Sequence, residues 1–159
     1  MTSPDNVPLI IPISLGFVNA FIVKQDGIIL IDTGIPGSEQ KILDTLRDQG
    51  CKPRDISLII ITHGHQDHAG SAASLHEISG APVACHADDA GFLEKGKQNT
   101  LKPCSITGYF LQFVFNRKKL SEYPSVHPDI LIDAPFDLES YGISGIIIPT
   151  PGHTKGPVS

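Results

Sequence analysis

A length of 159 residues, 40% of them hydrophobic and 18% charged, is typical of one globular domain with a buried core and excludes a disordered chain. The net charge of −5 argues against a nucleic-acid-binding surface. The first residues lack the basic and apolar segments of a secretion signal, and no apolar run approaches the roughly 20 residues that cross a bilayer, so we expect a cytoplasmic protein without stable membrane insertion.

Three short apolar segments open the chain and predict strands over residues 7–13, 18–23 and 28–31. Asp26-Gly27, a dipeptide typical of hairpin turns, precedes the third segment, so the opening is predicted to be an antiparallel meander. Asp32-Thr33-Gly34 follows the third segment, and the residue type alone explains Asp32 as a turn residue.

Helices and strands then alternate. Residues 38–49 predict a helix, because Ile42, Leu43 and Leu46 recur on one face, with Ser38 as a cap at its start and Gly50 as its stop. We expect further helices over residues 70–78 and 87–95. The apolar runs predict strands over residues 56–61, 82–85, 129–133, 136–138 and 143–148.

The stretch from His63 to His68 carries the strongest chemical signal of the chain. It holds three histidines and one aspartate directly after the predicted buried strand 56–61. His63 and His65 are two residues apart, so in an extended segment both side chains point to one side and can hold one metal ion. Asp67 and His68 follow a turn and can face a second ion. The alternative, a solvated polar loop rich in histidine, is disfavoured because four ligand-type residues rarely gather so densely by chance.

The remaining histidines and the cysteines carry no comparable signal. His76 is expected to be a surface or packing residue, His86 a structural residue at a strand end, and His127 has no assigned role. Cys51, Cys85 and Cys104 are widely spaced and form no CxxC pair, which favours free thiols in a reducing compartment.

The segment His63-Gly-His65-Gln-Asp67-His68 resembles the HxHxDH motif of the metallo-β-lactamase-fold hydrolases, such as glyoxalase II enzymes and lactonases. Residues 30–34 (LIDTG) and 149–154 (PTPGHT) are similar to two further motifs of this family and occur in the expected order. The resemblance implies the α/β class and an αββα sandwich, of which this chain would form the N-terminal half and the start of the second half.

The resemblance also implies a metal site. His63, His65 and His153 would bind one ion and leave a fourth position for water, as in a catalytic zinc site. Asp67 and His68 would bind a second ion, and Asp32 would support the metal-binding loop. The expected cofactor is therefore Zn²⁺, as one or two ions, with iron at the same ligands as an alternative.

The chain departs from the family at its C-terminal end. It stops six residues after His153, whereas family members continue with a further strand that carries a bridging aspartate. We therefore expect residues 1–159 to form one incomplete domain with an exposed sheet edge and apolar surface. It would be a fragment of a longer protein, a chain completed by a second copy as in a homodimer, or a short natural form.

Residues 96–128 are difficult to interpret from sequence. An aromatic cluster is followed by the basic residues 117–119; it consists of Tyr109, Phe110, Phe113 and Phe115. This pattern is typical of a helix docked on the core, of a surface that contacts a membrane or a partner, or of a helix that covers the active site. Because insertions at this place shape the substrate pocket in the family that the chain resembles, a pocket-covering insertion is our prediction.

The function implied is that of a zinc-dependent hydrolase. It would cleave a small ester, thioester or lactone through a metal-bound hydroxide, with Asp67 orienting the nucleophile or accepting its proton. Two alternatives are an iron-dependent redox member of the same fold and a truncated, non-catalytic metal-binding domain. We expect the chain to bind a small-molecule substrate, and we expect it to bind neither nucleic acid nor a membrane.

Overall fold

A six-stranded sheet forms the centre of the structure, a computed structural model that describes residues 7–97, 122–150 and 157–159. The strands lie side by side in chain order, so β1 and β6 form the two edges. They are β1 (Leu9–Ser14), β2 (Asn19–Lys24), β3 (Ile28–Ile31), β4 (Ile56–Ile61), β5 (Val83–His86) and β6 (Ile130–Ile132). The first three strands pair antiparallel, which confirms the predicted meander, and β3 to β6 pair parallel. The parallel half brings the carboxyl ends of β3, β4 and β5 to the same end of the sheet.

The central strand β4 is apolar except for Ser57, because both faces of the sheet are covered. Successive side chains of a strand point to opposite faces, so Ile59 and Ile61 enter one core cluster while Leu58 and Ile60 enter another. All four side chains are at most 3% exposed. The two clusters place β4, and therefore the polar loop that follows it, between two packed layers.

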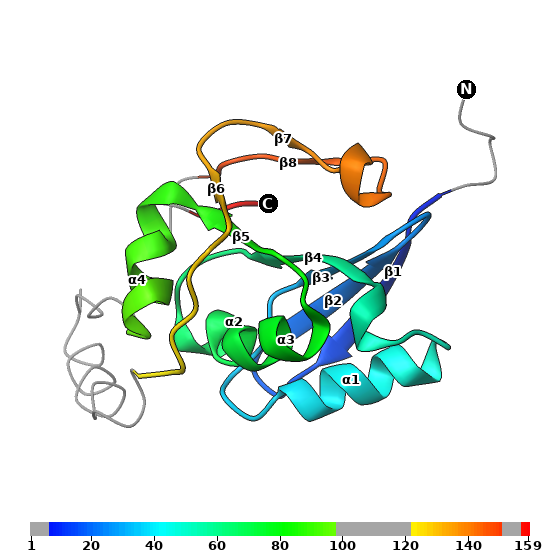
Figure 1. Ribbon diagram of the computed structural model, residues 1–159, viewed down its shortest axis with the longest axis horizontal. Coiled ribbons are helices and arrows are strands. Elements are labelled where there is room, and N and C mark those ends of the chain that lie inside the picture. Colours follow the sequence, from blue (N-terminus) through cyan, green and yellow to red (C-terminus); the bar gives the residue numbers. More distant parts are fainter. Residues whose placement is uncertain (1–6, 98–121, 151–156) are drawn as a thin grey trace.

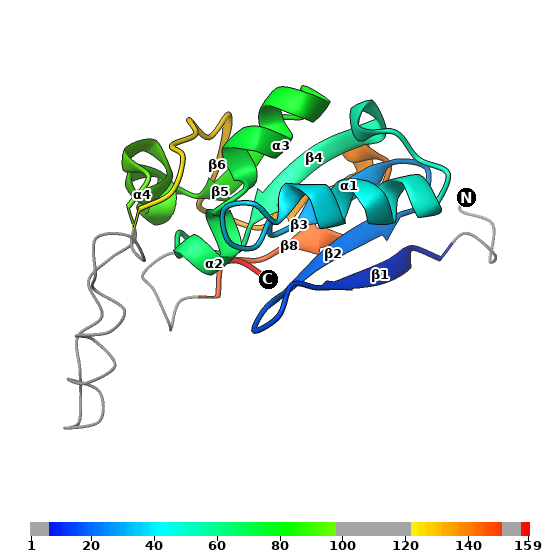
Figure 2. The same cartoon turned by 90° about the horizontal axis from the view of Figure 1, so that it is seen from below.

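Helices cover the first face. They are α1 (Glu39–Asp48), α3 (Ala72–Ser79) and α4 (Ala90–Lys95). Ile42 and Leu46 of α1 are fully buried against the sheet and belong to the apolar stripe predicted for residues 38–49, whose third member, Leu43, is partly buried. Leu75 of α3 is fully buried as well. Figures 1 and 2 show α1 and α3 on the same side of the sheet in both views.

A two-stranded antiparallel sheet covers the second face. It consists of β7 (Phe136–Asp137) and β8 (Ile146–Ile147), with the short helix η4 (Glu139–Tyr141) between them. Leu138, Ile143 and Ile147 close the second core cluster. Figure 1 shows β7 and β8 on the side of the central sheet opposite to α1 and α3.

Two details at the helix starts differ from the prediction. The helix expected over residues 70–78 is present as α3, which begins at Ala72, and it is preceded by a short helix that was not predicted, α2 (Gln66–Ala69). Ser38 makes no side-chain capping bond to α1; instead its backbone N–H donates to Ser71 Oγ at 3.0 Å. Ser71 also donates to Glu39 Oε2 at 2.8 Å, so tertiary contacts between the starts of α1 and α3 replace the local cap.

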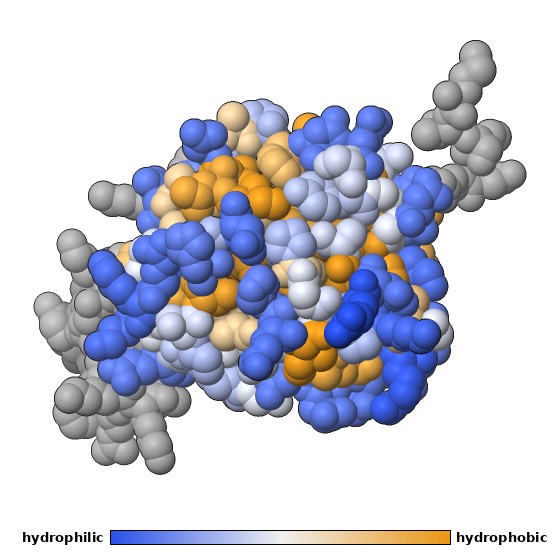
Figure 3. Space-filling view, viewed as in Figure 1, coloured by the Kyte–Doolittle hydropathy of each residue, from blue (hydrophilic) through white to orange (hydrophobic). Residues whose placement is uncertain are grey.

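Apolar side chains are exposed at both edges of the sheet, as the sequence predicted. Leu9 and Ile10 of β1 are 54% and 62% exposed, and Leu131 of β6 is 55% exposed. Ile146 and Ile148 add to the exposed apolar surface near β8. Figure 3 shows hydrophobic surface over the region of β6 to β8 and again between α1 and α3.

Three further expectations concern the cysteines, membrane-spanning helices and the predicted insertion 96–128. Cys51 and Cys85 are free and buried, while Cys104 lies outside the described residues. Within the described ranges, no helix combines the length and the hydrophobicity that a bilayer-spanning helix needs. Of the predicted insertion 96–128, the structure describes residues 96–97 and 122–128, so its aromatic cluster lies outside the described residues.

Candidate metal centre

The histidine-rich motif lies at the carboxyl end of β4. His63 and Gly64 form a short loop after the strand, His65 takes extended backbone angles directly before α2, and Asp67 and His68 lie on α2 itself. The Asp32-Thr33-Gly34 turn follows the parallel neighbour β3, whose Ile31 is in register with Ile60 of β4. The topology thus brings two polar segments together that are about 30 residues apart in sequence.

The turn after β3 holds the motif at both ends. Near the start, the backbone N–H of Asp32 donates to Ile60 O at 2.8 Å. Near the end, the backbone N–H and the hydroxyl of Thr33 both donate to His68 O, at 2.7 and 2.8 Å. Gly70 N donates to Gly34 O at 2.8 Å. The shape of the motif is therefore imposed by the neighbouring strand as well as by its own sequence.

The carboxylate of Asp32 is the centre of a hydrogen-bond network within the motif. It accepts the backbone N–H of Thr62 at 2.8 Å, the hydroxyl of Thr62 at 2.8 Å and Nδ1–H of His68 at 2.7 Å. Asp32 is only 4% exposed and has a φ of 59°, the only positive φ outside glycine in the described part of the chain. Aspartate tolerates this left-handed conformation better than most residues. The contacts support the loop as the family resemblance implied, and its role toward a metal stays a prediction.

Three imidazole rings of the motif lie together. The ring centroid of His63 is 4.6 Å from that of His65 and 4.0 Å from that of His68. His68 donates Nδ1–H to Asp32, and its other nitrogen, Nε2, lies 3.7 Å from Asp67 Oδ2. A carboxylate on one ring nitrogen orients the other nitrogen and makes it a better ligand, which is the usual environment of a metal-binding histidine.

The environment of His68 favours its protonated form in the metal-free chain. Burial lowers the pKa of this imidazole, but the hydrogen bond to Asp32 and the charges of Asp32 and Asp67 outweigh burial and raise the pKa above 6.5. The same two carboxylates would stabilise a cation bound beside the ring.

The donor set has the chemistry of a zinc or iron site, since imidazole nitrogens and a carboxylate oxygen are suitable ligands for both ions. Among residues 7–97, 122–150 and 157–159, however, no group of three or more histidine, cysteine, aspartate or glutamate side chains is arranged to enclose an ion. His153, the predicted third imidazole, lies outside the described residues. The roles of His63, His65, Asp67, His68 and His153 as ligands therefore stay predictions.

The glycine that ends the motif is required by close packing. A Cβ atom on Gly70 would lie 2.5 Å from Gln66 O and 2.5 Å from the backbone nitrogen of Pro36, and backbone atoms cannot move aside easily. In contrast, a Cβ atom on Gly91 of α4 would meet no atom within 4 Å.

Replacing Gly70 with alanine is expected to lower the free energy of unfolding by about 1–3 kcal/mol, because the added methyl group overpacks the contact with the turn after β3. Gly91→Ala is the matched control and should be neutral or stabilising by up to about 1 kcal/mol, since alanine is the better helix former. Urea unfolding of both variants measures the difference. Equal stabilities would contradict this explanation of Gly70.

Two residues that contact the motif were not predicted from the sequence. Asp89 follows β5 at the end of the short helix η2 (Ala87–Asp89), and its Oδ2 accepts the backbone N–H of Gly64 at 2.9 Å. Tyr123 donates its hydroxyl to Gly64 O at 2.9 Å. The one available signal was the acidic pair Asp88-Asp89 at a strand end, where we singled out His86 instead.

The other histidines have structural partners. His76 Nδ1 contacts Ala81 O at 2.8 Å, and His86 Nδ1 accepts the backbone N–H of Asp88 at 3.1 Å. His127 lies on the surface and contacts Glu94 at 3.0 Å. These contacts agree with the packing and structural roles expected for His76 and His86.

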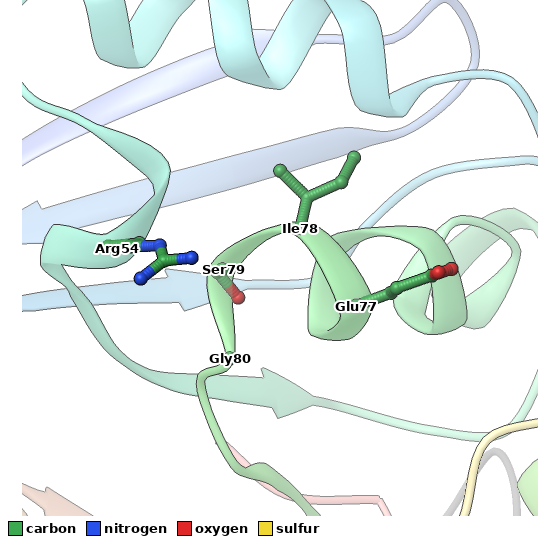
Figure 4. A pocket seen from close by; sticks show the side chains of 5 residues that line it. All are labelled: Arg54, Glu77, Ile78, Ser79 and Gly80. Atoms are coloured by element: carbon green, nitrogen blue, oxygen red, sulfur yellow. The ribbon is translucent and has the colours of Figure 1, made fainter.

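A surface hollow of 420 Å³ lies away from the motif, at the C-terminal end of α3 (Figure 4). Its lining contains no predicted site residue and consists of Arg54, Glu77, Ile78, Ser79 and Gly80. The hollow is open and shallow, and Ile78 and Gly80 are exposed. It is therefore not the candidate site.

Comparison with known proteins identifies relatives across nearly the whole chain. The model of the metallo-beta-lactamase superfamily matches residues 13–159. A probable metallo-hydrolase of Methanocaldococcus jannaschii is 31% identical over 141 residues, which are 89% of this chain and 60% of the relative. A UPF0173 metal-dependent hydrolase of Listeria monocytogenes is 36% identical over 103 residues, which are 64% of this chain and 42% of the relative.

Solved structures agree with this result. BJP-1, a subclass B3 metallo-beta-lactamase of Bradyrhizobium japonicum, is 25% identical and superposes with a TM-score of 0.74 over 97% of this chain and 53% of its own. The Rm3 metallo-beta-lactamase is 29% identical, with a TM-score of 0.71 over 92% of this chain and 51% of its own. The chain thus spans about half the length of the proteins that it matches.

Proposed function

Because the chain belongs to the metallo-beta-lactamase superfamily, we propose that it is a zinc-dependent hydrolase of a small ester, thioester or lactone. The observation that carries the proposal is the cluster of His63, His65 and His68 at the end of β4, with His68 oriented by the buried carboxylate of Asp32. Relatives named as metal-dependent hydrolases support the reaction class.

His63, His65 and His153 would hold the first zinc ion, and Asp67 and His68 would contribute to a second. When bound, zinc supplies an acidified water as nucleophile and a positive charge that stabilises the developing oxyanion. Two of these imidazoles, His63 and His65, come from one short loop whose start and end are bonded to the turn after β3, and these bonds restrain its backbone.

Asp67 is the residue that we assign to proton transfer. Its side chain is 47% exposed, so substrate and water can reach it, and Oδ2 lies 3.7 Å from His68 Nε2. A carboxylate in this position can orient the attacking water and accept its proton. Asp32 cannot take this part, because its oxygens are buried and already accept hydrogen bonds from Thr62 and His68.

Metal analysis combined with a hydrolysis assay tests the proposal. The purified chain should contain at least one zinc ion, and it should hydrolyse an ester, thioester or lactone in a reaction that a chelator stops and zinc restores. Near two zinc ions per chain would mean that further ligands complete the second site. Iron together with oxygen consumption would favour the redox alternative, and bound metal without turnover would favour a non-catalytic metal-binding domain. A chain that takes up no metal would exclude the proposal.

The proposed second metal ion leads to a prediction about the oligomeric state of the chain. Asp67 and His68 alone are too few ligands for a firm site, so we propose that a second copy or an additional C-terminal segment supplies the others. Light scattering with and without zinc separates these two, since only the first requires a dimer.

A further inference from the structure

Gly64 is held by side chains at both of its backbone polar groups, which belong to the two peptide units on either side of its Cα. Its N–H donates to Asp89 Oδ2 at 2.9 Å, and its C=O accepts the hydroxyl of Tyr123 at 2.9 Å. Both side chains are buried, with Asp89 0% and Tyr123 7% exposed. We call Asp89 and Tyr123 the Gly64 clamp.

The two clamp residues come from separate parts of the fold. Asp89 ends η2 directly before α4, whereas Tyr123 belongs to the segment that returns after residue 121. The returning segment is itself anchored, since Tyr123 N donates to Gly96 O at 2.9 Å and Glu122 pairs with Lys97 at 3.2 Å. The clamp therefore connects the loop to both ends of α4, because Asp89 lies at the start of this helix and Gly96 at its end.

Close packing adds a third restraint. A Cβ atom on Gly64 would lie 2.9 Å from Cβ of Phe92, so the loop backbone lies directly against α4 and has no space to shift toward it. The returning segment also touches the next turn of the motif, because Gln66 Nε2 donates to Glu122 O at 2.7 Å. Gly64 is thus fixed from several directions, although it carries no side chain.

Gly64 lies between His63 and His65, and a rotation of either peptide unit beside its Cα would move the two imidazoles relative to each other. Metal ligands must keep their positions within about half an ångström for tight binding. We propose that Asp89 and Tyr123 are positioning residues that set the spacing of His63 and His65 and thereby the affinity for the metal. This inference rests on the proposed metal site but adds two residues to it, neither of which is a ligand.

Metal affinity and thermal stability of four variants test the proposal. Tyr123→Phe removes one hydroxyl, Asp89→Ala removes the acceptor, and Asp89→Asn keeps an oxygen that can still accept the N–H of Gly64. Tyr141→Phe is the matched control, because this tyrosine lies in η4 against Phe136, away from the loop. Zinc affinity is measured against a chromophoric chelator, the cobalt(II) spectrum reports ligand geometry, and melting of the metal-free chain reports folding.

Tyr123→Phe and Asp89→Ala are each expected to weaken zinc binding by about tenfold, which is the lower end of the effect seen when groups that support metal ligands are removed. Both should also alter the cobalt(II) spectrum at temperatures well below the melting temperature. Asp89→Asn should restore most of the affinity, and Tyr141→Phe should bind as the unmodified chain does. If Asp89→Ala does not fold, Tyr123→Phe alone decides the question.

Two results would overturn the inference, and they differ in what they say of the proposed function. If the unmodified chain binds zinc and the folded clamp variants bind it equally well with an unchanged cobalt(II) spectrum, the clamp has no positioning role and the metal site stands. If the unmodified chain binds no zinc, the proposed function fails and the inference fails with it.

Discussion

Replacing His63 with alanine is expected to abolish metal uptake and hydrolysis together. His63 is the central ring of the cluster, with centroids 4.6 Å from His65 and 4.0 Å from His68. Loss of a group that only supports a metal ligand costs about 10–100-fold in affinity, so loss of a ligand should cost at least the upper value. Zinc content per chain and turnover of an ester, thioester or lactone measure the effect.

His127→Ala is the matched control for this variant. The side chain of His127 is 81% exposed and contacts Glu94 at 3.0 Å on the surface, so its loss should leave zinc content and turnover unchanged. The melting temperature of metal-free His63→Ala should stay near that of the unmodified chain. Undiminished hydrolysis by His63→Ala would sink the assignment of the metal site.

Replacing Asp32 with alanine is expected to destabilise the metal-free chain by about 2–4 kcal/mol and to weaken zinc binding by about 10–100-fold. The variant leaves the N–H of Thr62 and Nδ1–H of His68 without their buried acceptor. It also places alanine at a φ of 59°, which alanine adopts at a cost. Urea unfolding and zinc titration measure the two effects.

Two further variants separate these contributions. Asp32→Asn tolerates the left-handed backbone and retains one acceptor oxygen, so it should recover part of the stability while binding zinc more weakly than the unmodified chain. Asp137→Ala removes an exposed aspartate that accepts one backbone N–H, from Glu139 at 2.8 Å, and should cost no more than about 1 kcal/mol. An Asp32→Ala chain as stable as Asp137→Ala would contradict the network described for Asp32.

The order and kind of the main elements were predictable because local patterns set them. Asp26-Gly27 and the flanking apolar runs indicated the antiparallel pairing of β2 with β3, and the spacing of Ile42 and Leu46 indicated α1. The short helix α2 before α3 was not predicted. Between the two helices, Gly70 packs against Pro36 and Ser71 bonds to Glu39; both partners precede β4 in the sequence, so no local pattern marks them.

For the site, the sequence alone was enough to name candidate residues, whose metal-binding roles stay predictions. Three histidines and an aspartate within six positions after an apolar run are unusual enough to mark the candidate ligands without any structure. Asp32 was recognised only through family resemblance, since an aspartate before Thr-Gly is equally typical of a turn.

The tertiary structure alone decided how those residues are held. Parallel pairing of β3 with β4 places Asp32 beside Thr62 and His68, and parallel pairing of β4 with β5 places Asp89 beneath Gly64. Tyr123 reaches the carbonyl group of the same residue from 59 residues further along the chain. Contacts of this kind have no local signature, because any buried acceptor or donor at the right place could satisfy the same backbone group, and only the packed fold determines which one does.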